Sequence, residues 1–127
     1  MATRSFIGKL NHDGSITGIY CHWDGHPDGV GTILAEHYTN LQKVDQLLAL
    51  GDLSSLGPLL SPPEGQPHTF DSPAPNVTVA YHRDRGEDLQ PAKTYPSRRE
   101  FQKYVHEDFD ASYAYFINHR REWNTYA

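Results

Sequence analysis

The sequence predicts an α+β fold, with a mainly antiparallel five-stranded sheet and helices packed on one side of it. Three observations predict this fold. Strand-like runs occur in pairs near both ends of the chain, helical spacing follows the first pair, and a stretch rich in Pro, Gly and Ser interrupts the middle. The expected order is ββααβαββ, which is typical of α+β domains. Because 127 residues are enough for one core and too few for two good ones, we expect a single domain over 1–127.

The first pair of strands is predicted at 5–10 and 16–23. Between them lies Asn11-His12-Asp13-Gly14, and Asp-Gly between two strand-like runs is a strong signal for a tight hairpin turn. We therefore expect the chain to begin with a β-hairpin.

Two helices are predicted after this hairpin. Apolar residues recur at helical spacing over 29–38 and again over 41–50, with Gly51 as the stop of the second helix. Thr39-Asn40-Leu41-Gln42 has the spacing of a capping box, so we expect Thr39 to cap the second helix.

The remaining elements are less regular. Six prolines between 51 and 75 exclude a regular core element there and predict a long surface loop. The residues at 77–81 predict a strand, and 82–94 a charged connection. Ser97-Arg98-Arg99-Glu100 is a second capping box, which opens a helix. Strand-like runs at 113–117 and 122–126 predict a closing hairpin.

Composition narrows the range of functions. The net charge is −5 and the sequence pI about 5.8, which argues against non-specific binding of nucleic acid because phosphate neutralisation needs a basic surface. Local basic spots leave a specific anionic ligand open. The single cysteine excludes an intrachain disulfide, and no run approaches the roughly 20 apolar residues of a membrane span. We expect the protein to act in a reducing cytoplasm and to have no membrane partner.

The densest group of candidate functional residues follows the second strand. His22, Asp24 and His26 alternate, and imidazoles with a carboxylate are a plausible ligand set for zinc or another divalent ion. In the alternative reading, Asp24 forms an Asx-turn, Asp28 caps the helix, and the histidines are surface residues. No other cofactor is expected.

The helix start at Gly29, Gly31 and Thr32 is a candidate anion site. Free amides at a helix N-terminus and the helix dipole can hold a phosphate or carboxylate. The segment lacks the lysine and the glycine spacing of a P-loop, so no nucleotide hydrolysis follows from it. Glycines that allow close backbone packing are the alternative.

A second candidate group leaves the third strand at His82, Arg83 and Arg85. Two guanidinium groups suit the bidentate capture of phosphate or of a partner's carboxylates. The alternative is an exposed turn in which the arginines pair with neighbouring acidic residues. If this turn and the 22–31 loop lie at the same end of the sheet, they form one mixed-charge pocket.

Cys21 is a weak candidate for a nucleophile. Side chains alternate along a strand, so Ile19, Cys21 and Trp23 share one face, which we expect to be buried, while His22 faces away. A buried cysteine whose neighbouring histidine points to the other side is usually inert. The aromatic residues of the C-terminal third could stack bases, but they are also typical of a packed core.

Three segments of this chain resemble a family of small uncharacterised proteins of bacteriophages and prophages. They are Gly18-Ile19-Tyr20-Cys21-His22-Trp23-Asp24-Gly25-His26-Pro27 with the following Gly29-Val30-Gly31 and Glu36-His37-Tyr38, then Leu50-Gly51-Asp52-Leu53-Ser54-Ser55-Leu56, then Arg83-Asp84-Arg85-Gly86-Glu87. The resemblance implies an accessory phage protein that acts in the cytoplasm of an infected bacterium and counters host defence. It implies no catalytic residue.

Three functions follow as hypotheses. The first is a binding protein that blocks a host defence protein through an acidic surface, as anti-CRISPR inhibitors do. The second is a pocket that binds or sequesters a nucleotide-derived signal, using Gly29 to Thr32, Arg83, Arg85 and an aromatic platform. The third is a metal-dependent hydrolase built on His22, Asp24 and His26. Edge strands of the two hairpins could also pair with a second copy as a homodimer.

Overall fold

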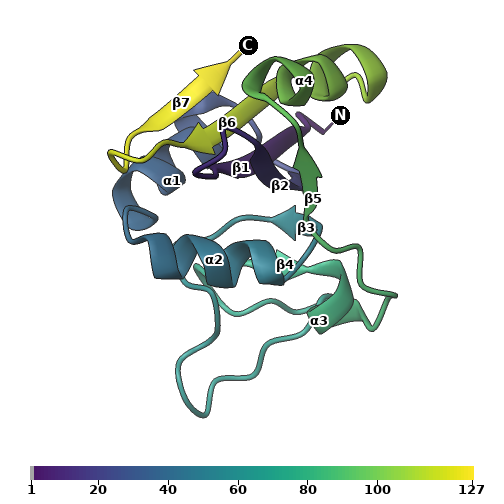
Figure 1. Cartoon of the computed structure of the whole chain (residues 1–127). Coiled ribbons are helices and arrows are strands. Elements are labelled where there is room, and N and C mark those ends of the chain that lie inside the picture. The colour runs from purple at the N-terminus through teal and green to yellow at the C-terminus, as the bar shows by residue number, and fades with distance from the viewer. Residues whose placement is uncertain (1) are drawn as a thin grey trace.

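The computed structural model of the chain describes residues 2–127 and has a mixed α+β architecture (Figure 1). The strands are β1 (Ser5–Leu10), β2 (Ile16–Cys21), β3 (Leu53–Ser55), β4 (Val79–Ala80), β5 (Lys93–Tyr95), β6 (Tyr113–Ile117) and β7 (Trp123–Tyr126). The α-helices are α1 (Thr32–His37), α2 (Leu41–Ala49), α3 (Tyr81–Arg85) and α4 (Arg98–Lys103). Two π-helical turns, η1 (Pro27–Gly31) and η2 (Tyr104–Asp108), adjoin α1 and α4.

Within residues 2–127 the sheet is mixed and has seven strands, so the predicted number of five strands was wrong. Four of its six strand pairs are antiparallel, in line with the prediction of a mainly antiparallel sheet. The order is β4-β3-β2-β1-β6-β7, and β5 pairs with β2. The pairs β1/β6 and β2/β3 are parallel. The chain passes through α1 and α2 between β2 and β3, and such a crossover returns the next strand in the same direction. β3 and β5 have three residues each, too few for a visible alternating pattern.

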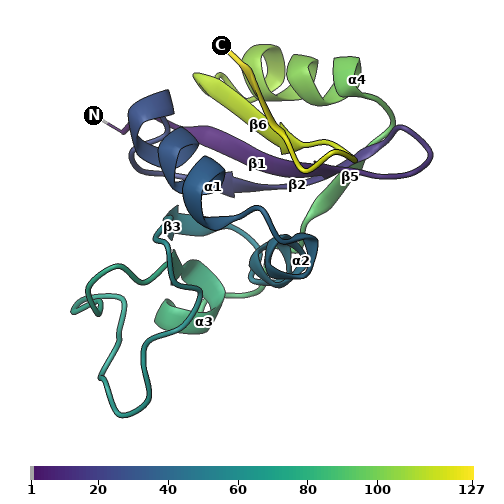
Figure 2. The same cartoon turned by 90° about the vertical axis from the view of Figure 1, so that its left-hand side faces the viewer.

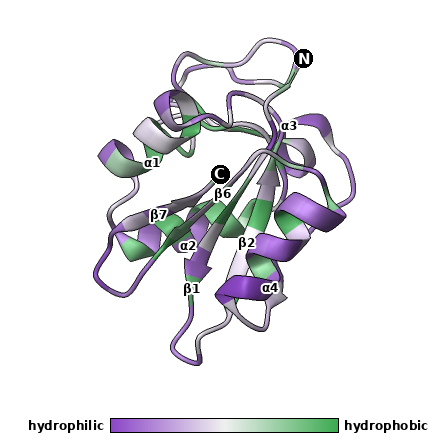
Figure 3. Ribbon diagram, turned by 90° about the horizontal axis from the view of Figure 1, so that it is seen from above, coloured by the Kyte–Doolittle hydropathy of each residue, from purple (hydrophilic) through white to green (hydrophobic). Residues whose placement is uncertain are grey.

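Helices cover both faces of the sheet, which corrects the expectation that they pack on one side. Figure 2 shows α4 on one side and α1 and α2 on the other. Leu34 and Leu47 pack with Ile19 in one buried cluster, whereas Phe101 packs with Phe116 in the other. Apolar strand residues accordingly lie between the helices in Figure 3. Both faces of the central strands are therefore core, as in α/β sheets.

Two facing glycines allow α4 to approach the sheet closely. Gly8 of β1 pairs with Gly18 of β2, and the ring of Phe101 lies over this pair. A Cβ atom at Gly18 would lie 3.2 Å from that ring and 3.1 Å from the Ile7 carbonyl oxygen. This contact fixes the position of α4 and of η2, which follows it in the chain.

Both predicted hairpins are confirmed, with pairing of β1 to β2 and of β6 to β7. Ser97 caps α4 as predicted, accepting a hydrogen bond from the Glu100 amide. The predicted cap of α2 was wrong by one residue. Its N-cap is Asn40, whose side chain accepts from the Gln42 and Lys43 amides.

The predicted strand at 77–81 is shorter than expected. Only Val79 and Ala80 are in β4, and Tyr81 already begins α3. The expected loop at 51–75 contains β3 at its start, and the expected connection at 82–94 contains most of α3 and the first residues of β5. Tyr81 is therefore placed at a strand-to-helix junction rather than inside a strand.

Candidate functional site: a cleft around Asp52

A cleft with a volume of about 330 Å³ lies where β2, the start of β3, α3 and the segment after η2 meet. Tyr20, Tyr81 and Phe109 supply aromatic surface to it, and Asp52 lies among them. The volume is at the small end of the range of ligand sites in proteins, where apolar walls with a few placed polar groups are usual.

Asp52 is held in place by backbone contacts on both of its sides. Gly51, with a φ of +74°, turns the chain from α2 into β3, a conformation that favours glycine. The Tyr20 amide donates to Asp52 Oδ1 at 3.1 Å, and the Tyr81 amide donates to the Asp52 carbonyl oxygen at 3.3 Å. The carboxylate is thereby fixed between two aromatic residues.

The Asp52 carboxyl group is only partly exposed to water. Burial raises its pKa, and the Tyr20 amide and the charge of Lys93 oppose this effect. A carboxylate in such surroundings is a strong acceptor for hydrogen bonds, because few water molecules compete for it.

Aromatic rings form a continuous wall on one side of the cleft. The ring centroids of Tyr20 and Phe109 are 5.0 Å apart, and Phe6 contacts both rings at 5.6 and 5.0 Å. These separations are typical of packed aromatic pairs, which hold each other rigidly. The rings of Tyr20 and Phe109, tilted by 53° to each other, offer apolar surface to a ligand in the cleft.

One cationic group, the guanidinium of Arg85, lies at the rim of the cleft. Arg85 packs its guanidinium against Phe70 at 4.4 Å and Tyr81 at 4.9 Å from the ring centroids, and it forms an ion pair with Glu87. His82 joins the rim, and its Nδ1 lies 2.7 Å from the Glu87 carbonyl oxygen. Glu87 and Asp88 also line the rim, so its charge is mixed.

The predicted anion site at Gly29 and Gly31 has its amides occupied within its own loop. The amides of Gly29 and Gly31 both donate to the His26 carbonyl oxygen, and the Val30 amide donates to that of Asp24. A Cβ atom at Gly29 would lie only 2.4 Å from the Asp24 carbonyl oxygen. The glycines therefore allow close backbone packing, and these three amides are not free for a phosphate.

The side chains of the predicted site residues between 24 and 32 do not converge on a common binding site. Thr32 donates its hydroxyl to the Pro27 carbonyl oxygen at 3.0 Å, and Asp24, with a φ of +56°, turns the chain out of β2. Asp28 is exposed in η1, whose N-cap His26 makes no side-chain cap bond. The alternative reading of Asp28 as a helix cap was therefore wrong.

Within residues 2–127, no group of three or more His, Cys, Asp or Glu side chains is arranged to hold a metal ion. His22, Asp24 and His26 therefore do not form the predicted ligand set. Gly25 and the turn at Asp24 break the extended backbone that would align them.

His22 instead contacts a residue of the cleft. Its Nδ1 lies 2.5 Å from the Tyr20 hydroxyl, and its ring packs edge-on against Trp23 with centroids 4.7 Å apart. The expectation that Trp23 is buried was wrong, because β2 ends at Cys21 and the alternation of faces ends with it; Trp23 is 45% exposed.

Cys21 is buried as expected. Burial raises the pKa of its thiol to about 12, and the sulfur donates weakly to the Trp23 carbonyl oxygen. A thiol with this pKa holds almost no thiolate at neutral pH, so it is a poor nucleophile.

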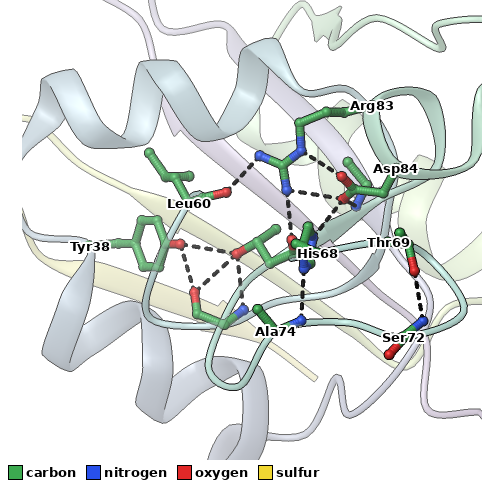
Figure 4. A network of polar contacts seen from close by, with 11 residues as sticks. Tyr38, Leu60, His68, Thr69, Ser72, Ala74, Arg83 and Asp84 are labelled. Atoms are coloured by element: carbon green, nitrogen blue, oxygen red, sulfur yellow. Dashed lines mark hydrogen bonds and ion pairs between the residues drawn. The ribbon is translucent and has the colours of Figure 1, made fainter. Parts of the chain in front are cut away.

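Arg83 belongs to a structural network rather than to the cleft (Figure 4). Its guanidinium donates to the carbonyl oxygens of Leu60 at 2.6 Å and Thr78 at 2.7 Å, and it pairs with Asp84. Asp84 also accepts from the Ala80 amide at 2.8 Å. These contacts tie the long loop to α3.

His68 completes this network from within the loop. Its Nδ1 accepts from the Ala74 amide at 2.9 Å, so the proton of the neutral imidazole is on Nε2, which lies 3.3 Å from the Asp84 carboxylate (Figure 4). Both side chains are about 95% buried. The network also places Phe70, whose amide donates to the Asp84 carbonyl oxygen, beside Arg85.

The 22–31 loop and the 82–86 turn do not share one pocket, and only the 82–86 turn contributes to the cleft. His82 and Arg85 line the cleft, whereas no residue of 22–31 does. The register places Cys21, Leu53 and Ala80 side by side, and from this row the chain continues out of β2 and out of β4 in opposite directions. His22 contacts the cleft residue Tyr20.

Sequence reasoning missed Asp52 and Tyr81 as site residues. Asp52 lies between a helix-ending glycine and a three-residue strand, inside a segment that reads as loop. Tyr81 looks like the end of a strand. Tyr20, Asp52, Arg85 and Glu87 come from three segments that are far apart in the chain and meet at this cleft.

No family model matches this chain, and the comparisons with curated proteins and with solved structures found no match. Among residues 2–127, none of the helices has the length and apolar character needed to cross a membrane.

Proposed function

We propose that this chain is a small binding protein that holds a nucleotide-derived ligand in the cleft around Asp52. The observation that carries the proposal is one partly buried carboxylate set among aromatic rings, with the guanidinium of Arg85 in the same cleft. A nucleotide has three matching parts: a flat base, hydrogen-bond donors on the edge of that base, and an anionic phosphate.

The aromatic wall suits the base. Tyr20 and Phe109 are held by their own packing, so little side-chain entropy is lost when a ring stacks on them. Stacking of a base on an aromatic side chain contributes about 1–3 kcal/mol. Asp52 then accepts hydrogen bonds from the edge of the base inside the cleft.

The charged residues at the rim suit a ligand with few phosphate groups. Arg85 is oriented by Phe70 and Tyr81, which leaves it prepared to contact a phosphate, and His82 lies next to it. Glu87 and Asp88 limit the negative charge that the rim accepts. The cleft therefore favours a mononucleotide or a signal with few phosphates over a triphosphate.

This function agrees with the role that the resemblance implies. A binder that withholds a nucleotide signal in an infected bacterium would weaken any defence system that depends on that signal. The nucleotide pocket predicted from the sequence used Gly29 to Thr32 and Arg83. In the present proposal Tyr20, Asp52 and Tyr81 take their place as binding residues.

Thermal unfolding in the presence of nucleosides and their monophosphates tests the proposal. A ligand at 100 times its Kd adds about 2.7 kcal/mol to stability. We expect at least one nucleoside monophosphate to stabilise the protein. In Arg85→Ala the affinity for that nucleotide should fall roughly tenfold to a hundredfold, because a charged hydrogen bond is lost.

The same variant should bind the corresponding nucleoside as the wild type does, since Arg85 is assigned to the phosphate. Arg120→Ala, which removes an exposed arginine from the β6/β7 turn, is the matched control and should change neither affinity. A panel in which no nucleoside or nucleotide raises the unfolding temperature would exclude the proposed function.

A second candidate is the blocking of a host defence protein, and exposed Trp23 favours it. Its indole is 45% exposed and held against His22, and tryptophans in such positions often anchor protein interfaces. Trp23→Ala should then abolish binding to a purified defence protein while leaving nucleotide binding intact. Unchanged binding in Trp23→Ala would remove this candidate.

A further inference from the structure

The cleft continues into a smaller recess behind Asp52. This recess has a volume of about 60 Å³ and shares Tyr20, Asp52, Gln90 and Phe109 with the cleft. The recess has room for ordered waters or for the polar edge of a base. Because it is much smaller than the cleft of about 330 Å³, we place the edge of a base in the recess and its sugar toward the cleft.

The recess holds one hydrogen-bond donor without a partner. Tyr95 lines it and is only 8% exposed, and its hydroxyl makes no hydrogen bond to any residue of 2–127. A buried hydroxyl in this state is unfavourable until a partner arrives. Burial and, to a lesser degree, the charge of Asp52 raise its pKa to about 12, so the hydroxyl keeps its proton and remains a donor.

The recess has a buried donor and a carboxylate acceptor. Asp52 offers two acceptor oxygens, of which Oδ1 already accepts from the Tyr20 amide and still has a free lone pair. Tyr95 offers the buried donor, whereas Lys93, which also lines the recess, is exposed to water. A ligand edge that pairs with both groups carries one acceptor for Tyr95 and two adjacent donors for Asp52.

Among the common bases, guanine presents this sequence on its Watson–Crick edge. Its O6 is an acceptor, and N1–H and the 2-amino group are adjacent donors. Adenine, cytosine and uracil each place a ring nitrogen or carbonyl acceptor where a second donor is needed, and an ionised carboxylate repels an acceptor.

We propose, resting on the function proposed above, that the cleft is selective for guanine, with Asp52 accepting from N1–H and the 2-amino group and Tyr95 donating to O6. Titration calorimetry with GMP, IMP, AMP and XMP tests this assignment. IMP lacks the 2-amino group and should bind roughly tenfold to a hundredfold more weakly than GMP. AMP and XMP should bind more weakly still.

In Asp52→Asn we expect the preference between GMP and XMP to reverse. A purely structural role of Asp52 would not produce this reversal. An amide at position 52 still accepts from the Tyr20 amide through its oxygen, so the fold is retained, and its NH₂ group now faces position 2 of the base. The variant should prefer XMP, which carries a carbonyl there, over GMP. Tyr95→Phe should weaken GMP and IMP by the same factor and leave AMP unchanged.

The outcomes separate the two proposals. Binding of all four nucleotides with similar affinity, or an Asp52→Asn variant that keeps its preference for GMP, would overturn the guanine assignment and leave the binding function in place. No binding of any nucleotide by the wild type would overturn both.

Discussion

Asp52 is the residue on which the proposed function depends, and its carboxylate also opposes folding. Its carboxylate has lost part of its hydration, and the Tyr20 amide and Lys93 compensate only in part, so its pKa is raised. Ligand sites often contain groups that oppose folding, because the same desolvation strengthens their contacts with a ligand.

This cost predicts a pH-dependent gain of stability in Asp52→Asn. A carboxyl group whose folded-state pKa lies above its unfolded value of 3.8 destabilises the fold once it ionises, and the loss is complete above the folded-state pKa. The variant should therefore unfold at a higher temperature than the wild type at pH 7. The difference should shrink as the pH falls toward 4.

Calorimetry at several pH values measures this difference. Asp71→Asn is the control, because Asp71 lies at an exposed position of the long loop. A lower unfolding temperature of Asp52→Asn at pH 7 would show that the carboxylate stabilises the fold, contrary to this prediction.

At the residue scale the sequence showed part of the site. Alternation along the second strand correctly separated His22 and Tyr20 from the buried Cys21, and His82 and Arg85 were among the predicted site residues. Their partner Asp52 could not be found, because its role depends on tertiary contacts with residues 32 and 29 positions away in the chain.

The elements that shape the cleft are short, and tertiary contacts hold them. α3 has five residues, far fewer than a helix needs to be stable by itself. The ion pairs and hydrogen bonds of Arg83, Asp84 and His68 fix it to the long loop (Figure 4). We infer that this network, not helix propensity, positions Tyr81, His82 and Arg85.

Asp84→Ala is therefore predicted to destabilise the protein by roughly 3–5 kcal/mol, since it leaves Arg83 and His68 without their carboxylate partner. Denaturant unfolding measures the change. Proteolysis within 60–76 should also become faster, because the loop loses its attachment to α3. Asp71→Ala, at an exposed position of the same loop, should change stability by less than about 0.5 kcal/mol.

The stabilisation by Asp84 should disappear in acid. Burial opposes its ionised form, but hydrogen bonds from Arg83 and the Ala80 amide outweigh burial, and the pKa of Asp84 lies below its ordinary value of 3.8. The stabilisation by Asp84 is complete when the pH lies above 3.8, the pKa of this group in the unfolded chain, and it is lost as the pH falls through the lower pKa of the folded state. If the free energy of unfolding differs between wild type and Asp84→Ala by the same amount at pH 7 and at pH 2, the stabilisation does not come from the ionised carboxylate of Asp84.

At the element scale, long and strongly patterned segments were predictable and short ones were not. The two hairpins and α2 followed from turn residues and periodicity. β3, β4 and β5 have two or three residues each and exist because neighbouring strands pair with them. Local sequence carries little information about strands of that length.

For the whole molecule, the sequence predicted the α+β class but not the topology. Neither the parallel pairing of β1 with β6 nor the second core under α4 follows from local patterns, because both join distant parts of the chain. The two cores make the sheet rigid on both faces, and the cleft lies where β2 meets the irregular half of the molecule. The expectation that the first hairpin offers an edge strand was wrong, because β1 lies between β2 and β6 and β2 lies between β1 and β3. Pairing of β7 with a second copy stays a prediction, which sedimentation equilibrium tests.

The most direct test of the cleft as the binding site is an NMR titration of the ¹⁵N-labelled protein with GMP, AMP, CMP and UMP in turn. We predict that GMP shifts the amide resonances of Tyr20, Asp52, Tyr81 and Phe109, while those of Gly29 to Thr32 stay in place. Shifts confined to the 22–31 loop, or no shift with any of the four nucleotides, would contradict a ligand site at Asp52.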